Sequence, residues 1–235
     1  MLIDTGAERS MNSRILMQCS KEPQPEYVVE KLMSNFPGWE YQHYDDQSML
    51  DYIRSNPIEE FPSADERMLY YYAGSHRADF FRYFFLYQNG GAYIDSDLMI
   101  EKNIQEDIDF YDMVTVRNSV MPAIFQGFFI CDRYNTVVYE ALKDMYYLKN
   151  DQSALEDDYQ AICKNMFIIL NKDKNYSKKI YNERYVKYFN EAGEKMECAL
   201  IMDNNEVIGA HYYEDKIIPK TFMNEGFADR IIRYL

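Results

Sequence analysis

Two carboxylates one residue apart, Asp95 and Asp97, are the side chains whose type and spacing most directly suggest chemistry in this chain. They follow the apolar segment 92–94, so we expect them at the carboxyl end of a strand, where open α/β sheets bind ligands. Carboxylate oxygens select hard cations such as Mg²⁺ and Mn²⁺, and two carboxylates leave coordination positions for water and phosphate oxygens. This pattern suits a nucleoside diphosphate leaving group, whose charge a metal neutralises.

A second pair of charged residues lies upstream, in the aromatic-rich segment 78–89. Asp79 and Arg82 are three residues apart, so a helix would place them on one face. The neighbouring phenylalanines indicate partial burial, and buried charges need partners such as sugar hydroxyls. An ordinary surface ion pair explains the same spacing. Gly90 or Gly91 is expected to end this helix, because glycine accepts the left-handed conformation of a C-terminal cap.

The elements that position these residues follow from hydrophobic periodicity and turn residues. We expect a strand, a helix, a strand and a helix, in that order, at residues 14–19, 26–35, 39–44 and 47–55. This order opens a parallel sheet of the nucleotide-binding type. A capping box that begins at Ser63 predicts a helix over 66–72, and Ser75 is expected to cap a helix over 76–88.

The rest of the chain predicts more strands and two amphipathic helices. The strand candidates are residues 92–94, 113–116, 123–131, 198–202 and 206–210. The helices are expected at 135–148 and 156–170, and a polar loop at 171–177. We therefore predict an α/β fold in a single domain, with a mixed, mainly parallel central sheet flanked by helices.

Composition narrows the classes of protein. With 235 residues, 47% of them hydrophobic and 16% aromatic, the chain is long and apolar enough for a sizeable core. A net charge of −14 without a basic run excludes a duplex nucleic-acid binder and disfavours anionic membranes. The 23 tyrosines suit clefts for polar ligands such as sugars, although most are expected to line the edge of the core.

The sequence also bears on location. No uninterrupted apolar stretch approaches the roughly 18 residues of a membrane span, and the N-terminus lacks a signal-peptide pattern. Cys19, Cys131, Cys163 and Cys198 are far apart and form no CxxC pair, which favours reduced thiols over disulfides or zinc. We expect a cytoplasmic protein without a membrane span.

Segment 78–97 resembles the sugar-binding DxD region of GT-A glycosyltransferases. The matching residues are Ala78, Asp79, Arg82, Leu86, Tyr87, Gly90, Gly91, Tyr93, Asp95, Ser96 and Asp97. The segment is most similar to glycosyltransferase family 32, that of yeast initiating mannosyltransferases and bacterial capsular polysaccharide transferases, and the large clostridial glucosylating toxins share this core. Residues 14–19 and 37–46 extend the resemblance more weakly, so it covers the first half of the chain best.

The resemblance implies a GT-A fold and a nucleotide-activated sugar as donor. Asp95 and Asp97 would bind a divalent metal, Mn²⁺ or Mg²⁺, with Asp97 the more direct ligand, and Ser96 would bind substrate. Asp79 and Arg82 would contact the donor sugar and its diphosphate or ribose, and Arg82 would take part in catalysis with the two carboxylates.

The family is a retaining one, which implies attack by the acceptor hydroxyl on the front face of the sugar. No carboxylate in the sequence stands out as the base that an inverting enzyme needs. Gln126 and Gly127 lie after the DxD strand, where GT-A folds often place contacts to the acceptor or the donor sugar. Gly127 lies inside a strand candidate, and such a glycine often marks a bulge or the close approach of a ligand.

A second resemblance concerns His211 and Lys216. Glycogenin-like GT-A enzymes place a histidine near the C-terminus as a metal ligand and a lysine a few residues later on the diphosphate. An imidazole can complete a metal site, and a lysine can bind phosphate as a point charge. The pattern departs here, because Glu214 stands where a glycine is expected and the lysine spacing is shorter. A hydrogen-bonded strand-end histidine and a solvated lysine are the alternatives.

These observations predict a metal-dependent hexosyltransferase of polysaccharide biosynthesis, which uses a UDP- or GDP-linked sugar and a glycan hydroxyl as acceptor. Residues 14–97 would form the half that binds the nucleotide sugar, and residues 98–235 the half that binds the acceptor. The alternatives are a toxin-like transferase that modifies a protein side chain and a catalytically silent sugar-binding protein. A nucleotidyltransferase or phosphatase shares the acid pair but usually has a Gly-rich phosphate loop or a nucleophilic Asp motif, which the sequence lacks.

Overall fold

A computed structural model describes residues 13–147, 152–172, 174, 176–189 and 195–212. Within this part of the chain, nine strands form one sheet in the order β2-β1-β3-β6-β5-β7-β8-β9-β4. The strands are β1 (Ile15–Cys19), β2 (Glu40–Tyr44), β3 (Gly91–Ile94), β4 (Leu98–Ile100), β5 (Met113–Arg117), β6 (Ile124–Cys131), β7 (Lys178–Phe189), β8 (Lys195–Asp203) and β9 (Glu206–His211). The helices are α1 (Glu26–Ser34), α2 (Asp46–Ser55), α3 (Ala64–Tyr70), α4 (Gly74–Asn89), α5 (Gln105–Phe110), α6 (Thr136–Tyr146), α7 (Gln152–Asp157) and α8 (Ala161–Lys172).

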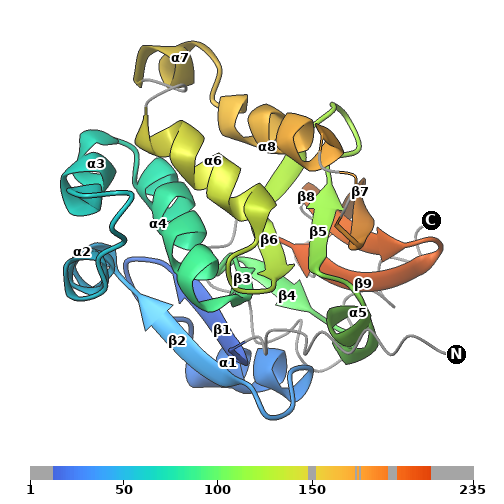
Figure 1. The fold of residues 1–235 in the computed structure, drawn as a ribbon. Helices are drawn as coiled ribbons and strands as arrows, with labels where there is room; N and C mark the ends of the chain where they lie inside the picture. The colour runs from blue at the N-terminus through green and yellow to red at the C-terminus, as the bar shows by residue number, and fades with distance from the viewer. Residues whose placement is uncertain (1–12, 148–151, 173, 175, 190–194, 213–235) are drawn as a thin grey trace, which may run out of the picture.

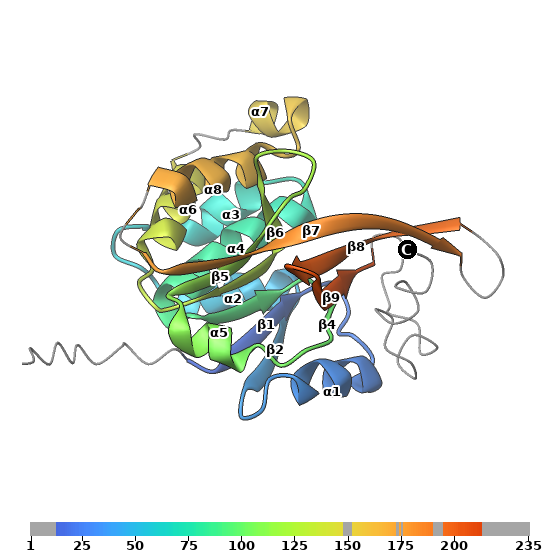
Figure 2. The same ribbon diagram turned by 90° about the vertical axis from the view of Figure 1, so that its right-hand side faces the viewer.

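Helices cover both faces of the sheet (Figures 1 and 2). On one face, α4, α6 and α8 pack against the strands through a core rich in α4 phenylalanines, such as Phe80 and Phe84. On the other face, α1 and α5 contribute Val28, Leu32 and Ile108 to a second core. This arrangement confirms the predicted α/β fold with a mixed sheet flanked by helices.

The prediction of a mainly parallel sheet is wrong. β1 pairs in parallel with β2 and β3, and β5 pairs in parallel with β7. The other five pairs of neighbouring strands in the described residues are antiparallel. The parallel opening holds for β1 to β3, but β7, β8 and β9 follow one another as antiparallel neighbours, and antiparallel strands need no crossover helix.

Glycines fix the junction between α4 and β3. Gly90 ends α4 with φ 68°, as the sequence predicts. Gly91 has φ +95°, and a Cβ atom there would lie 2.6 Å from the carbonyl oxygen of Ile15. Only glycine combines this conformation with so close an approach to β1. The junction therefore holds α4 and the strand that ends at Asp95 in a fixed relation.

Helix starts were predicted with mixed success. Asp45 forms a capping box with Ser48 at the start of α2. The capping box expected at Ser63 is wrong: Ser63 is the N-cap of α3, but in the described chain its side chain caps no backbone N–H, and its φ is 60°. α4 begins at Gly74, one residue before the expected cap, Ser75.

Several elements were not predicted correctly from the sequence. β4, α5 and the long strand β7 were not predicted, and the helix expected at 156–170 is divided between α7 and α8. β7 carries many charged side chains, which obscure the alternation of apolar and polar residues that predicts a strand. Its inward positions, such as Tyr181 and Glu183, are identified by their burial in the structure. None of the helices in the described ranges has the length and apolar character that a bilayer crossing requires.

Candidate active site

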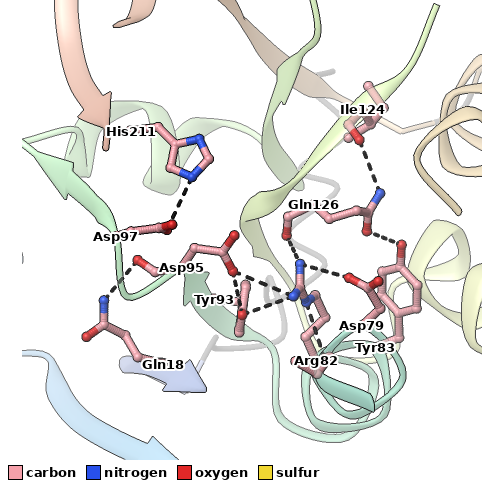
Figure 3. Close-up of polar contacts among 11 residues, drawn as sticks. Gln18, Asp79, Arg82, Tyr83, Tyr93, Asp95, Asp97, Ile124, Gln126 and His211 are labelled. Atoms are coloured by element: carbon pink, nitrogen blue, oxygen red, sulfur yellow. Dashed lines mark hydrogen bonds and ion pairs between the residues drawn. The ribbon is translucent and has the colours of Figure 1, made fainter. Parts of the chain in front are cut away.

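The end of β3 is held by its neighbours on both sides (Figure 3). The backbone N–H of Asp95 donates to the carbonyl of Gly127 on β6, at 2.8 Å. The Nε2 amide of Gln18, at the end of β1, donates to the carbonyl of Asp95 at 3.1 Å. The Asp95 backbone is therefore fixed before its side chain meets any ligand.

The guanidinium of Arg82, on α4, is the centre of a buried group of polar side chains. Its Nη1 atom lies 3.2 Å from Asp79 Oδ1, and its Nη2 atom lies 3.6 Å from Asp95 Oδ1. It also donates to the carbonyls of Ala78 and Gln126. We call Asp79, Arg82, Tyr93, Asp95 and Gln126 the Arg82 cluster. Because the donors of Arg82 are engaged by the protein, the residue is suited to positioning the two carboxylates.

Tyr93 connects the two ends of this cluster. Its hydroxyl donates to Asp95 Oδ1 at 2.6 Å and accepts from Arg82 Nη2 at 3.0 Å. The guanidinium also lies over the ring of Tyr93, 4.0 Å from its centroid. At the other end, Tyr83 donates to the side-chain oxygen of Gln126, whose Nε2 donates to the carbonyl of Ile124 at 3.2 Å. The side chain of Gln126 is therefore fixed as well.

Burial changes the acidity of the cluster. Burial raises the pKa of Asp79 to about 6, even though the charge of Arg82 lowers it. For Arg82, burial lowers the pKa, but Tyr93, Asp79 and Asp95 outweigh it, so the net pKa lies above the ordinary value. Arg82 therefore remains charged at neutral pH, and Asp79 titrates close to the physiological range.

Asp97 meets a residue from the far end of the chain. β4 follows Asp97 directly and pairs with β9, which places Leu98 opposite His211. The backbone N–H of Tyr212 donates to the carbonyl of Asp97 at 2.9 Å, and His211 Nε2 lies 3.2 Å from Asp97 Oδ1. Ligand atoms of Asp95, Asp97 and His211 all lie within 4.8 Å of one another. We call these three residues the metal cluster.

The surroundings of His211 favour positive charge. Burial lowers the pKa of its imidazole, but the hydrogen bond to Asp97 and the charges of Asp97, Asp95 and Glu183 raise it, with a net pKa above the ordinary value. The ring of Phe125 packs against the imidazole at 4.7 Å between centroids. The same carboxylates that favour a proton on His211 would therefore favour a divalent cation at this site.

The metal cluster fits a divalent metal ion. Two carboxylates and an imidazole are a donor set for Mn²⁺ or Mg²⁺ with positions left for other oxygens. Gly127 leaves room for this set, because a Cβ atom at that position would lie 2.4 Å from Asp95 Oδ2. The close approach expected at this glycine is therefore an approach to Asp95.

The structure brings together most of the residues singled out from the sequence. Ser96 lies half-buried between the two carboxylates. Lys216 lies outside the described residues. Gln18 was missed, and Tyr93, which belongs to the resemblance, was given no role, although it is two residues before Asp95 and so lies on the same face of the strand. Only the pairing of strands indicates Gln18.

Glu183, on β7, was also missed. It is 3% exposed and accepts a hydrogen bond from the Asn118 side chain at 2.7 Å. Tyr185 pairs with Ala199, which pairs with His211, so Tyr185 and His211 lie on one face of the sheet. Glu183 is two residues from Tyr185 and shares this face. Because β7 was not predicted, this placement of Glu183 could not be derived from the sequence.

Comparison with known proteins supports a sugar-transferring site. Residues 23–122 match the model of a family described as "Glycosyltransferase sugar-binding region containing DXD motif". A search of curated proteins found no match. Among solved structures, "PaToxG Glycosyltransferase" is similar with a TM-score of 0.48 and 12% identity, over 68% of this chain and 69% of that chain.

The family match spans the end of β3, α4 and both carboxylates, the segment from which most of the site is built. Residues 23–122 therefore match the DxD sugar-binding region of glycosyltransferases, and this match supports an enzyme that transfers a glycosyl group. Its sheet and helices are consistent with the GT-A fold.

Proposed function

We propose that the protein transfers a hexose from a UDP- or GDP-linked sugar to a hydroxyl group of a glycan, in polysaccharide biosynthesis, with a divalent metal ion bound. The observation that supports this most strongly is the metal cluster, in which Asp95, Asp97 and His211 converge beside the buried Arg82 cluster. Assignment to glycosyltransferase family 32 is part of this proposal and rests on the resemblance of residues 78–97.

Each residue has a role in this proposal. Asp95, Asp97 and His211 would hold Mn²⁺ or Mg²⁺, which neutralises charge on a departing diphosphate when it is bound. Arg82 fixes Asp79 and Asp95 through the contacts described above, and Asp79 offers its carboxylate to the donor sugar. Residues 14–97 bind the nucleotide sugar, and residues 98–235 bind the acceptor and add His211 and the contacts of β6 to the donor side.

Contacts to substrate from β6 complete the donor side. Gln126 has its side chain held by Tyr83, and its neighbour Gly127 faces Asp95. Ser96, between the two carboxylates, is placed to contact the same ligand. Because these groups are held before substrate binds, little ordering remains to be done when it arrives. Exclusion of water then lets the acceptor hydroxyl compete for the sugar.

We propose retention of the anomeric configuration, following the resemblance. The alternative is inversion, which needs a base. Glu183 is suited to that role, because it is a buried carboxylate on the same face of the sheet as His211. The anomeric configuration of the product, measured by NMR, is expected to be retained. An inverted product, together with an inactive Glu183→Gln variant, would contradict retention and assign the base to Glu183.

Thermal unfolding in the presence of donors tests the function. A ligand that binds only the folded state raises the midpoint of unfolding by mass action. We expect a rise with either UDP-sugars or GDP-sugars that requires Mn²⁺ and disappears in Asp97→Ala. This variant is expected to keep the fold but to lose transfer. His43→Ala is the matched control, because His43 bonds Ser20 outside the metal cluster.

Two results would refute the proposal. The first is a well-folded protein whose midpoint no nucleotide sugar changes, which would favour a catalytically silent binding protein. The second is metal-stimulated transfer that persists in folded Asp97→Ala. A product formed on a protein side chain in place of a glycan would leave the donor chemistry standing and change the acceptor.

A further inference from the structure

Four tyrosines are exposed at the end of the molecule where α4 begins. Tyr70, Tyr72, Tyr147 and Tyr159 are 45%, 77%, 61% and 59% exposed, and we call them the tyrosine platform. They come from the end of α3, the end of α6 and the segment before α8. Large side chains of this kind are usually at least half-buried, so a group of exposed rings indicates a binding surface.

Ring contacts join three members of the platform, Tyr70, Tyr147 and Tyr159, through buried and half-buried residues. Tyr70 packs against Tyr71 at 6.2 Å between centroids, and Tyr71 packs against His76 at 6.4 Å. His76 in turn packs against Tyr159 at 5.1 Å. The guanidinium of Arg67 lies 5.6 Å from the rings of both Tyr70 and Tyr146, and Tyr146 packs against Tyr147. These three exposed rings therefore share one support, and Tyr72 directly follows Tyr71 in the chain.

The platform continues into the proposed active site along α4. His76, Asp79 and Arg82 follow one another at intervals of three residues, all are buried, and they share one face of the helix. The rise of a helix puts His76 about 9 Å from Arg82 along the axis. Tyr159, which packs on His76, therefore lies one to two helical turns outward from the residues that hold the donor side.

We propose that the tyrosine platform binds the acceptor as an extended, neutral oligosaccharide, with several sugar rings lying on the tyrosines beyond the reacting one. This inference rests on the proposed transfer to a glycan. A tyrosine offers an apolar ring face to the C–H face of a sugar and a hydroxyl to its polar rim. The platform is thus suited to a ligand with both apolar and polar faces.

Charge argues against other occupants. The chain carries a net charge of −14, which repels a second copy of itself and an anionic polymer. A neutral glycan meets no such repulsion. In addition, the Nε2 atom of His76, beneath Tyr159, is buried and makes no hydrogen bond to the described residues. A ligand hydroxyl that bonds this nitrogen would offset the free-energy cost of burying it without a hydrogen bond.

Binding to linear glucose and mannose oligosaccharides of increasing length, measured by calorimetry, tests the inference. Tyr72→Ala and Tyr159→Ala are expected to weaken binding of the longer oligosaccharides by about three- to tenfold each, and to leave monosaccharide binding unchanged. Tyr159→Phe keeps the ring and should keep most of the affinity. Phe110→Ala is the matched control, because Phe110 is 72% exposed on α5, away from the platform.

Hydrolysis of the nucleotide sugar without an acceptor separates this inference from the proposed function. The platform variants should release nucleoside diphosphate at the wild-type rate, since they do not touch the donor. Loss of oligosaccharide binding in the variants would support the platform even if no donor is ever hydrolysed. The inference would be overturned if the wild type binds none of these oligosaccharides, or if the platform variants and Phe110→Ala behave alike. It would also be overturned if the variants abolish only self-association.

Discussion

The Arg82 cluster and the metal cluster share Asp95 but are built in different ways. In the Arg82 cluster, nearly every polar group already bonds another, and four of its five members come from residues 79–95. In the metal cluster, the side chains of Asp97 and His211 lie 3.2 Å apart, and His211 comes from more than a hundred residues away. The Arg82 cluster holds its shape without a ligand, whereas the metal cluster offers several acceptor atoms to a ligand. One region therefore supplies rigidity and the other supplies ligand chemistry.

The largest effect is expected from Arg82→Ala, which removes the centre of the first region. Its pair with Asp79 is buried and its pair with Asp95 is half-buried, and removal of Arg82 would leave uncompensated charge, which costs about 3–5 kcal/mol of unfolding free energy. Transfer should fall by at least about 10³-fold. Denaturant unfolding and kcat/KM measure both effects.

Arg54→Ala is the control for this variant. Its ion pair with Asp65 is short, at 2.9 Å, but largely exposed, so its loss should cost less than about 1 kcal/mol. Equal stability of the two variants would show that the Arg82 cluster is not the rigid region described above.

Gly127→Ala tests the boundary between the regions. The added Cβ would lie 2.4 Å from Asp95 Oδ2 and 2.3 Å from the end of the Phe125 ring, so Asp95 must move. We expect about 10²-fold lower activity with a stability loss of about 1–3 kcal/mol. Gly74→Ala is the control, because no atom of the described chain lies within 4 Å of its Cβ position. Unchanged activity in Gly127→Ala would contradict the placement of Asp95.

His211→Ala addresses the metal cluster alone. We expect the Mn²⁺ concentration for half-maximal activity to rise by about 10- to 100-fold, because one of the three ligands is lost. The rate at saturating Mn²⁺ should largely recover, and the stability should change little, since the Arg82 cluster stays intact. A loss of rate that no metal concentration restores would mean that His211 acts on the substrate instead.

The smallest effect concerns pH and Asp79. Its folded pKa of about 6 lies above the ordinary value of 3.8, so the folded state keeps a proton that the unfolded state loses. Stability should therefore fall as pH rises from about 4 to 6, by on the order of 1–3 kcal/mol, and then level off. In Asp79→Asn this decline should be reduced. An identical pH profile for the variant and the wild type would assign the decline to another group.

Much of the site could be predicted because it is local in sequence. Asp79, Arg82 and Asp95 lie within one helix, one Gly-Gly junction and one short strand, and each of these has its own sequence signal. The predicted positions of β1, α1, β2 and α2 agree with the structure to within one residue at each end. The order of these elements and the spacing of the two carboxylates predicted an α/β fold with a metal site suited to a nucleoside diphosphate, and the resemblance of residues 78–97 implied the sugar.

The tertiary structure decided what depends on pairing between distant strands. Charged side chains obscure the alternation of buried and exposed residues in β7, so this strand was not predicted. Without it, neither the antiparallel half of the sheet nor the placement of Glu183 could be derived. His211 was a candidate through its resemblance to the metal-binding histidine of glycogenin-like enzymes, but only the pairing of β4 with β9 brings it to Asp97. The sequence alone indicates which side chains are suited to bind a metal and a sugar, because residue chemistry and local periodicity can be followed along the chain. Which of them meet was decided by the register of the sheet, because register depends on contacts between residues far apart in the chain.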